Sequence, residues 1–194
     1  MWVRGNFLGL QDITSGYSAA SRAIVEYNES NYARLRIVLS GSVATRSGTA
    51  SYLASPGPPG ITSPCQALAC EYSDNSRVLF LRVGAEALIS KLTALTGLFP
   101  KRKMEFDPTQ FTSRQLISGL KGMVESLVRQ VNDETVLISP VALKEMEQAI
   151  MVQFLLACRH NFSPLLEQDG DKSVPIHVRR AAEFIEPVGI SRLQ

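Results

Sequence analysis

Hydrophobic and polar residues alternate over much of the first half of the chain, and a period of two is typical of β-strands with one buried face. In the clearest example, the apolar residues of 33–39 share one face while Arg34 and Arg36 lie on the other. Short strands with no helix between them predict a small antiparallel sandwich or barrel, which we place at residues 8–84. Further strands are expected over 18–27, 43–46, 49–54, 66–72 and 77–83, with turns rich in Gly, Pro, Ser and Asn between them.

In the second half of the chain the apolar residues recur every three to four positions, which is the period of an α-helix. A first helix is expected over 85–96, and Gly97 should end it. The Thr-Ser-Arg-Gln sequence at 112–115 has the spacing of a capping box and predicts the start of a second helix. Ser139 and Pro140 should begin a third, which continues to about His160 and runs antiparallel to the second. The fold class is therefore α+β, with a helical part over 85–165.

The second helix carries a stripe of apolar residues that admits two interpretations. The stripe can pack against the strands of the same chain, or it can form a dimer interface in which helices of two subunits meet. Both interpretations remain open at this point, and a homodimer is the partner we expect. The stripe consists of Leu116, Leu120, Met123, Leu127 and Val131.

Composition and charge exclude several classes of protein. Hydrophobic residues make up 45% of the 194, which excludes a disordered chain, and no apolar run approaches the length of a membrane span. No signal peptide is recognisable, and three irregularly spaced cysteines do not form a disulfide framework, so we expect a cytoplasmic protein without membrane contact. Lys and Arg number 20 against 18 Asp and Glu, which is not the basic excess of a nucleic-acid-binding surface.

The sequence gives no support to a catalytic, metal or cofactor site. Neither His160 nor His177 falls in a predicted strand, which argues against the metal site of a cupin-type enzyme. His160 lies near a predicted helix C-terminus, where a cationic side chain suits the helix dipole, so both histidines are interpreted as structural. Nucleophile elbows, phosphate loops and Cys-x-x-Cys pairs are absent from the sequence. We therefore predict that the protein is not an enzyme.

A small barrel can instead hold one small ligand among polar side chains. An arginine inside such a barrel is costly unless it meets an anion, and a carboxylate fits its planar fork. In the alternative interpretation, the same arginines lie on the solvent face and make weak surface ion pairs. The candidate ligand-binding residues are Arg22, Arg34, Arg36, Tyr72 and Arg82.

Three stretches, in this order, resemble the N-terminal effector-binding and dimerisation part of AraC/XylS-type transcriptional regulators. They are Tyr-Ala-Arg-Leu-Arg-Ile-Val-Leu-Ser-Gly-Ser-Val-Ala-Thr-Arg at 32–46, Leu-Ala-Ser-Pro-Gly at 53–57 followed by Ile-Thr-Ser-Pro at 61–64, and Leu-Leu-Ala-Cys-Arg-His-Asn-Phe-Ser at 155–163 followed by Val-Arg-Arg-Ala-Ala-Glu-Phe-Ile-Glu at 178–186. The resemblance implies a cupin-like barrel, a small-molecule effector, a homodimer and a bacterial origin. Residues 174–186 would begin the helix that leads to a DNA-binding domain.

The chain departs from this family where the resemblance ends. Two helix-turn-helix units would follow the linker helix in the family, whereas Pro187 should break that helix here. DNA would be contacted only through a domain that these 194 residues do not contain. The resemblance therefore implies the regulatory part of a ligand-responsive transcription regulator. A standalone dimerisation module that binds no ligand is the alternative.

Overall fold

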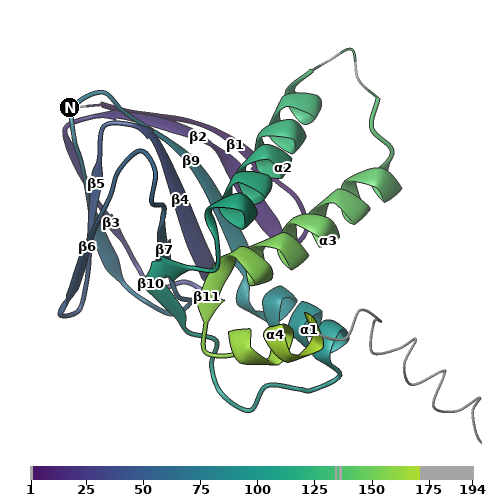
Figure 1. Ribbon diagram of the computed structural model, residues 1–194. Helices are drawn as coiled ribbons and strands as arrows, with labels where there is room; N and C mark the ends of the chain where they lie inside the picture. Colours follow the sequence, from purple (N-terminus) through teal and green to yellow (C-terminus); the bar gives the residue numbers. More distant parts are fainter. Residues whose placement is uncertain (1, 134, 136, 171–194) are drawn as a thin grey trace, which may run out of the picture.

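Two antiparallel sheets face each other in the computed structural model, which describes residues 2–133, 135 and 137–170 (Figure 1). The five-stranded sheet has the order β1 (Trp2–Gly9), β2 (Ile13–Ser21), β9 (Ser76–Gly84), β4 (Tyr32–Ser40) and β7 (Gly60–Thr62). The four-stranded sheet has the order β3 (Ala23–Tyr27), β8 (Leu68–Tyr72), β5 (Val43–Ser47) and β6 (Ala50–Ala54). With the helices that follow, this arrangement confirms the α+β class.

The two sheets are not hydrogen-bonded into a closed barrel, and the predicted 18–27 strand is in fact two strands. The chain leaves the first sheet after β2 and enters the second at β3, with Arg22 between them at a φ of 30°. A positive φ is rare for residues other than glycine and asparagine, so no sequence signal announces this break. The sheet also begins at Trp2 rather than at residue 8, because β1 pairs with β2 over its whole length.

Four helices and a third, two-stranded sheet complete the fold of the described residues. The helices are α1 (Ala85–Thr96), α2 (Arg114–Asn132), α3 (Pro140–Ala157) and α4 (Ser163–Gly170), and the small sheet pairs β10 (Phe106–Phe111) with β11 (Cys158–His160). As predicted, α1 ends at Gly97, which has a φ of 71°, and α3 begins after Ser139, whose hydroxyl accepts a bond from the amide of Ala142. The cap of α2 is Ser113 rather than Thr112, since its hydroxyl accepts the 3.1 Å bond from the Leu116 amide.

Both strands of the small sheet were missed by the sequence prediction. The connection after α1 contains β10, and the chain becomes extended at Cys158, so α3 stops before the predicted end at His160. The pairing of β10 with β11 joins segments about 50 residues apart, and a local pattern carries no information about such a partner. The residues 174–186, including His177, lie outside the part of the chain that the structure describes.

The face of α2 that packs against the chain's own core is not centred on the predicted stripe. Ile117, Val124 and Val128 are buried together with Leu120 and Leu127. Leu120 and Leu127 are fully covered within one chain, which favours the interpretation that the stripe packs against the chain's own strands at these two positions. The physical reason is that α2 has apolar residues on both sides of the predicted stripe, and packing selects one side. Of the remaining stripe, Leu116 and Met123 are half-buried and Val131 is exposed.

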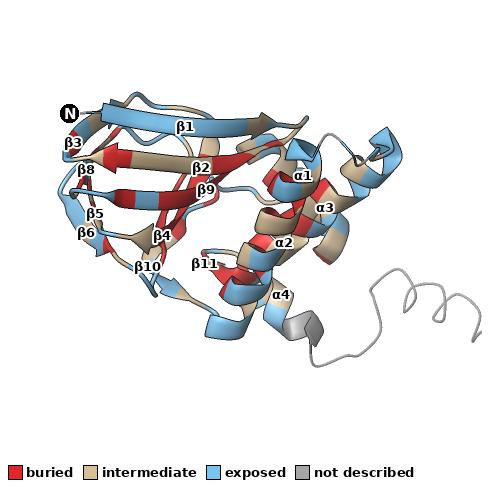
Figure 2. Cartoon of the chain, turned by 90° about the horizontal axis from the view of Figure 1, so that it is seen from above, coloured by how far each residue is buried: buried red, intermediate tan, exposed pale blue. Residues whose placement is uncertain are grey.

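Buried residues form two separate cores (Figure 2). The larger core lies between one face of the five-stranded sheet and the helices, where Leu35 and Leu81 meet Leu120 and Phe154. The smaller core lies between the two sheets and includes Val38, Val43, Cys70 and Val78, with the other members being Ala20, Ala23, Ala54, Leu68 and Tyr72. A carboxylate also joins the layers, because Glu147 of α3 accepts hydrogen bonds from the amides of Asp12 and Ile13, at 2.7 and 3.0 Å.

His160 has a structural role, but as a neutral residue rather than the expected cation. Its Nε2–H donates to the carbonyl of Leu155 at 3.2 Å, and its Nδ1 accepts from the amide of Phe162 at 3.2 Å. A proton on Nδ1 would place two donors against each other. Burial lowers the pKa of His160 to about 4, and this outweighs the bond to the Leu155 carbonyl, which favours the protonated form.

His160 should therefore make folding stability depend on pH. The folded-state pKa of about 4 lies below the ordinary value of 6.5, so only the unfolded chain takes up this proton between the two values. The free energy of unfolding should fall by about 3 kcal/mol from this group alone as the pH drops from 7 to 4. Urea unfolding of the wild type and His160→Gln at both pH values checks this. Parallel pH profiles of the two proteins would show that His160 does not titrate as argued.

Candidate ligand site between the sheets

Strand alternation places Arg34 and Arg36 in the space between the sheets. On β4 the odd-numbered residues Ala33, Leu35 and Ile37 belong to the core under the helices, as predicted. The even-numbered arginines face the opposite way, and the register pairs Arg34 with Arg82 and Arg36 with Phe80 of β9. Both arginines are buried, at 3% and 4% exposure, so the interpretation that they lie on a solvent face is wrong.

Arg34 is held by oxygen atoms of the protein itself. Its Nη2 donates to the carbonyl of Asn28 at 3.1 Å and to the hydroxyl of Ser30, and its Nη1 donates to the carbonyl of Gln66 at 3.4 Å. The guanidinium also lies 4.6 Å from the centre of the Tyr32 ring, which is a favourable cation–π distance. These contacts compensate for much of the solvation that Arg34 loses on burial, although its Nε has no partner.

Arg36 is less well satisfied. Its Nη1 donates to the hydroxyl of Tyr52 at 3.4 Å, and Tyr52 in turn donates to the carbonyl of Ile61 at 3.0 Å. The Nη2 of Arg36 is buried and has no hydrogen-bond partner. A buried charged donor without a partner is costly, and most such groups in proteins are bonded to something. Arg36 therefore offers unused donor capacity to an anion.

Tyrosine hydroxyls form the other polar wall of the site. The hydroxyl oxygens of Tyr72 and Tyr27 lie 3.1 Å apart, and burial raises the pKa of Tyr72 and of Tyr52. Both tyrosines therefore stay neutral and can donate a hydrogen bond at ordinary pH. No aspartate or glutamate belongs to the lining, which consists of Val3, Phe7, Ser18, Tyr27, Arg34, Leu35, Arg36, Tyr72, Val78, Phe80 and Arg82.

The cavity enclosed by these residues is small, at about 70 Å³. That volume suits a few water molecules or a small anionic group rather than a whole metabolite. One wall is only partly packed, because Phe7 on the edge strand β1 is 58% exposed while its ring lies 5.1 Å from that of Phe80. The edge at β1 is therefore where the cavity can enlarge with least loss of packing.

The structure brings together four of the five predicted ligand-binding residues. Arg34, Arg36, Tyr72 and Arg82 line this cavity, whereas Arg22 is exposed on the turn between β2 and β3 and lies outside it. Arg22 was placed wrongly because the chain changes sheets there. Sequence reasoning missed Tyr27, Phe7 and Phe80 as lining residues. Strand alternation from Arg82 could have identified Phe80, but nothing local indicates Phe7.

The described part of the chain contains no group of three or more His, Cys, Asp or Glu side chains placed to hold a metal ion. Among the same residues, no helix is long and apolar enough to cross a membrane.

The family model of the AraC-binding-like domain matches residues 3–156 of this sequence. The chain belongs to the AraC-binding-like domain family. No curated protein matches the sequence. The family assignment confirms the resemblance drawn from the three sequence stretches.

Among solved structures, this AraC-binding-like domain is similar to the AraC-like transcriptional activator CuxR, with a TM-score of 0.58 and 12% identity. The match covers 78% of this chain and 53% of CuxR, so the chain spans about half the length of that protein. The EutQ protein of Salmonella typhimurium, at a TM-score of 0.39 and 17% identity, matches over 43% of this chain and 70% of its own. A cupin superfamily protein of Desulfitobacterium hafniense has a TM-score of 0.39 and 14% identity over 42% and 77% of the two chains. The CuxR match supports the fold and nothing further.

The two buried arginines should differ in their contribution to stability. Arg34→Met leaves the Asn28 and Gln66 carbonyls without their donors, whereas Arg36→Met removes a poorly partnered buried charge and leaves an isosteric apolar chain. We expect Arg34→Met to lower the free energy of unfolding by about 1–3 kcal/mol more than Arg36→Met. Urea unfolding measures the difference, and equal losses would contradict this assignment of partners.

Proposed function

We propose that this AraC-binding-like domain is the regulatory part of a transcription regulator and binds a small carboxylate between its sheets. The observation that carries the proposal is the pair of buried arginines in a cavity lined by no acidic residue, with Nη2 of Arg36 and Nε of Arg34 unpartnered. A carboxylate would supply the missing acceptors, and charge-assisted hydrogen bonds are among the strong ones. The side chains of Tyr72 and Tyr27, whose hydroxyl oxygens lie 3.1 Å apart, line the same cavity.

Ligand binding in this cavity would act on the helices through strands that are shared by both layers. On β9, Phe80 and Arg82 line the cavity while the alternate residues Leu79 and Leu81 pack under the helices. A carboxylate that draws the arginines inward would therefore shift side chains at the helix interface. The ligand changes the equilibrium only by the difference between its affinities for the two arrangements.

The proposed function also includes properties that do not follow from the inter-sheet cavity. We propose that DNA is bound by a separate domain that these residues do not contain, since Lys and Arg exceed Asp and Glu by only two. The domain itself would be non-catalytic, and it would work in the cytoplasm of a bacterium. These proposals rest on the family.

A thermal-shift screen against small carboxylates tests the ligand proposal. A ligand at a hundred times its dissociation constant should stabilise the protein by about 2.7 kcal/mol, which is seen as a raised melting temperature. The shift should vanish in Arg36→Met and persist in Arg46→Met, a matched change at an exposed arginine of β5. An equal shift in all three proteins would place the ligand elsewhere. The absence of any hit with a stable dimer would favour a dimerisation module that binds no ligand.

We also propose that the domain forms a homodimer through the end of its helix pair. Antiparallel α2 and α3 project away from the sheets (Figure 1). The apolar residues Val131, Leu137 and Val141 are exposed near the connection between these helices. Exposed apolar surface that is contiguous is typical of protein–protein contact sites, and the proposal is that these three residues contribute to one. This surface replaces the stripe containing Leu120 and Leu127 as the proposed interface.

The double substitution Val131→Glu and Val141→Glu should convert a dimer into a folded monomer, because it places like charges in the contact. Sedimentation velocity measures the change in mass. Ile24→Glu, at an exposed apolar residue on β3, is the matched control and should remain dimeric. A double variant that stays dimeric would exclude this surface. Glutamate at Leu120 and Leu127 should instead unfold the chain, since both are core residues.

A further inference from the structure

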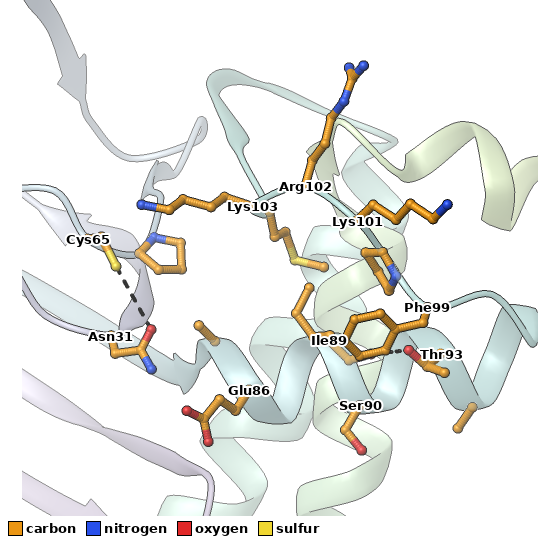
Figure 3. A pocket seen from close by; sticks show the side chains of 15 residues that line it. Asn31, Cys65, Glu86, Ile89, Ser90, Thr93, Phe99, Lys101, Arg102 and Lys103 are labelled. Carbon is orange, nitrogen blue, oxygen red and sulfur yellow. Dashed lines mark hydrogen bonds between the residues drawn. The ribbon is translucent and has the colours of Figure 1, made fainter.

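A second and larger hollow lies outside the sheets, between α1 and the segment 97–104 (Figure 3). Its volume is about 800 Å³, within the range of sites for small organic molecules and far above the inter-sheet cavity. We call it the α1 groove. Its lining consists of Asn31, Pro64, Cys65, Ala85, Glu86, Ile89, Ser90, Thr93, Ala94, Phe99, Pro100, Lys101, Arg102, Lys103 and Met104.

The floor of the α1 groove is apolar. Met104 is a buried member of the larger core, and Ile89 is half-buried and packs against that core. The floor of the groove is therefore continuous with the larger core. Phe99 is 73% exposed, and its ring lies beside α1 in Figure 3. The ring of Phe99 therefore extends the apolar surface of the groove beyond its floor.

The rim of the α1 groove is cationic on one side. Lys101, Arg102 and Lys103 are consecutive and exposed, and no ion pair involves them among the residues that the structure describes. In Figure 3 the side chains of Lys101 and Lys103 extend in opposite directions along the groove, while the guanidinium of Arg102 points away from α1. Glu86 is the one acidic residue of the lining, and it lies across α1 from these cations.

We propose that the α1 groove binds an amphiphilic anion, meaning a molecule with one apolar body and one anionic head group. The apolar body would lie against Ile89, Phe99 and Met104, where it removes apolar surface from water. The head group would lie at one end of the groove, against the ammonium group of Lys101 or that of Lys103, neither of which has an ion-pair partner among the described residues. A polar solute would not fit the apolar floor, and a purely apolar one would leave the cations unused. This site is independent of the carboxylate cavity between the sheets.

The position of the α1 groove also connects it to the rest of the domain. α1 follows β9 directly and packs against α3 and α4. An occupant would therefore rest on the helix that joins the cavity-lining strand to the helical layer. A ligand in the α1 groove would therefore act on the packing of the helices. A ligand in the inter-sheet cavity would act on the same packing through β9.

Methyl NMR with dodecanoate as the probe tests the proposal on the whole chain. We expect saturable shifts of the Ile89 and Met104 methyl signals, with no shift of the Val3 methyls in the inter-sheet cavity. Dodecanol, which lacks the charge, should bind roughly fivefold or more weakly than dodecanoate, the difference expected for a partly exposed ion pair. Equal affinity for the two molecules would overturn the assignment of the cationic rim.

Matched variants separate the groove from general charge effects. Replacing Lys101 and Lys103 with Gln should weaken dodecanoate binding about fivefold or more, whereas Arg102→Gln should change it less than about twofold. Ala94→Phe, at an exposed position of α1 that lines the groove, should fill it and abolish the shifts while leaving the remaining spectrum intact. Equal losses for Arg102 and for the lysines, or unimpaired binding to Ala94→Phe, would overturn the proposal.

Discussion

The whole structure depends on the alternation of side chains along β4 and β9, the two central strands of the five-stranded sheet. Each strand directs aliphatic residues toward the helices, and toward the second sheet it directs arginine or aromatic residues together with one valine, Val38 on β4 and Val78 on β9. Because a shift of one residue would exchange the two faces, the register is strongly fixed. Helix packing and cavity chemistry are therefore two consequences of a single pairing.

This arrangement buries the guanidinium groups of Arg34 and Arg36, and the burial of a charged group costs free energy because the group loses its hydration. Arg34 meets part of its desolvation cost through carbonyl and hydroxyl acceptors and through the Tyr32 ring, whereas Arg36 has the long bond to Tyr52 and a 6.0 Å approach to the Tyr27 ring. Replacing buried charges with apolar residues is often neutral or stabilising, so the pair is poorly explained by stability alone. Donors left unpaired in the folded domain are the groups from which an anionic ligand gains most of its binding energy.

The sequence was sufficient wherever a local rule decides the structure. The alternation over 33–39, the left-handed cap at Gly97 and the Ser139 cap each follow from residues that are neighbours in the chain. The sequence prediction failed where an element packs or pairs with a segment that is distant along the chain. The change of sheet at Arg22, the pairing of β10 with β11 and the side of α2 that packs inward are all chosen by tertiary contacts. For the same reason the lining residues on β4 and β9 were predictable, whereas Phe7 on the edge strand was not.

A second connection between the layers runs through Glu147. Its carboxylate, buried on α3, accepts hydrogen bonds from the amide of Asp12, in the turn between β1 and β2, and from the amide of Ile13, the first residue of β2. Displacing that turn from α3 would leave two backbone donors and a buried carboxylate without partners, which is more costly than the loss of a surface contact. The partly exposed Phe7 lies on β1, so the weakly packed wall of the cavity belongs to the same hairpin that α3 holds by this bond. Opening of the cavity is thus limited to movements of β1 that leave the end of its hairpin on α3.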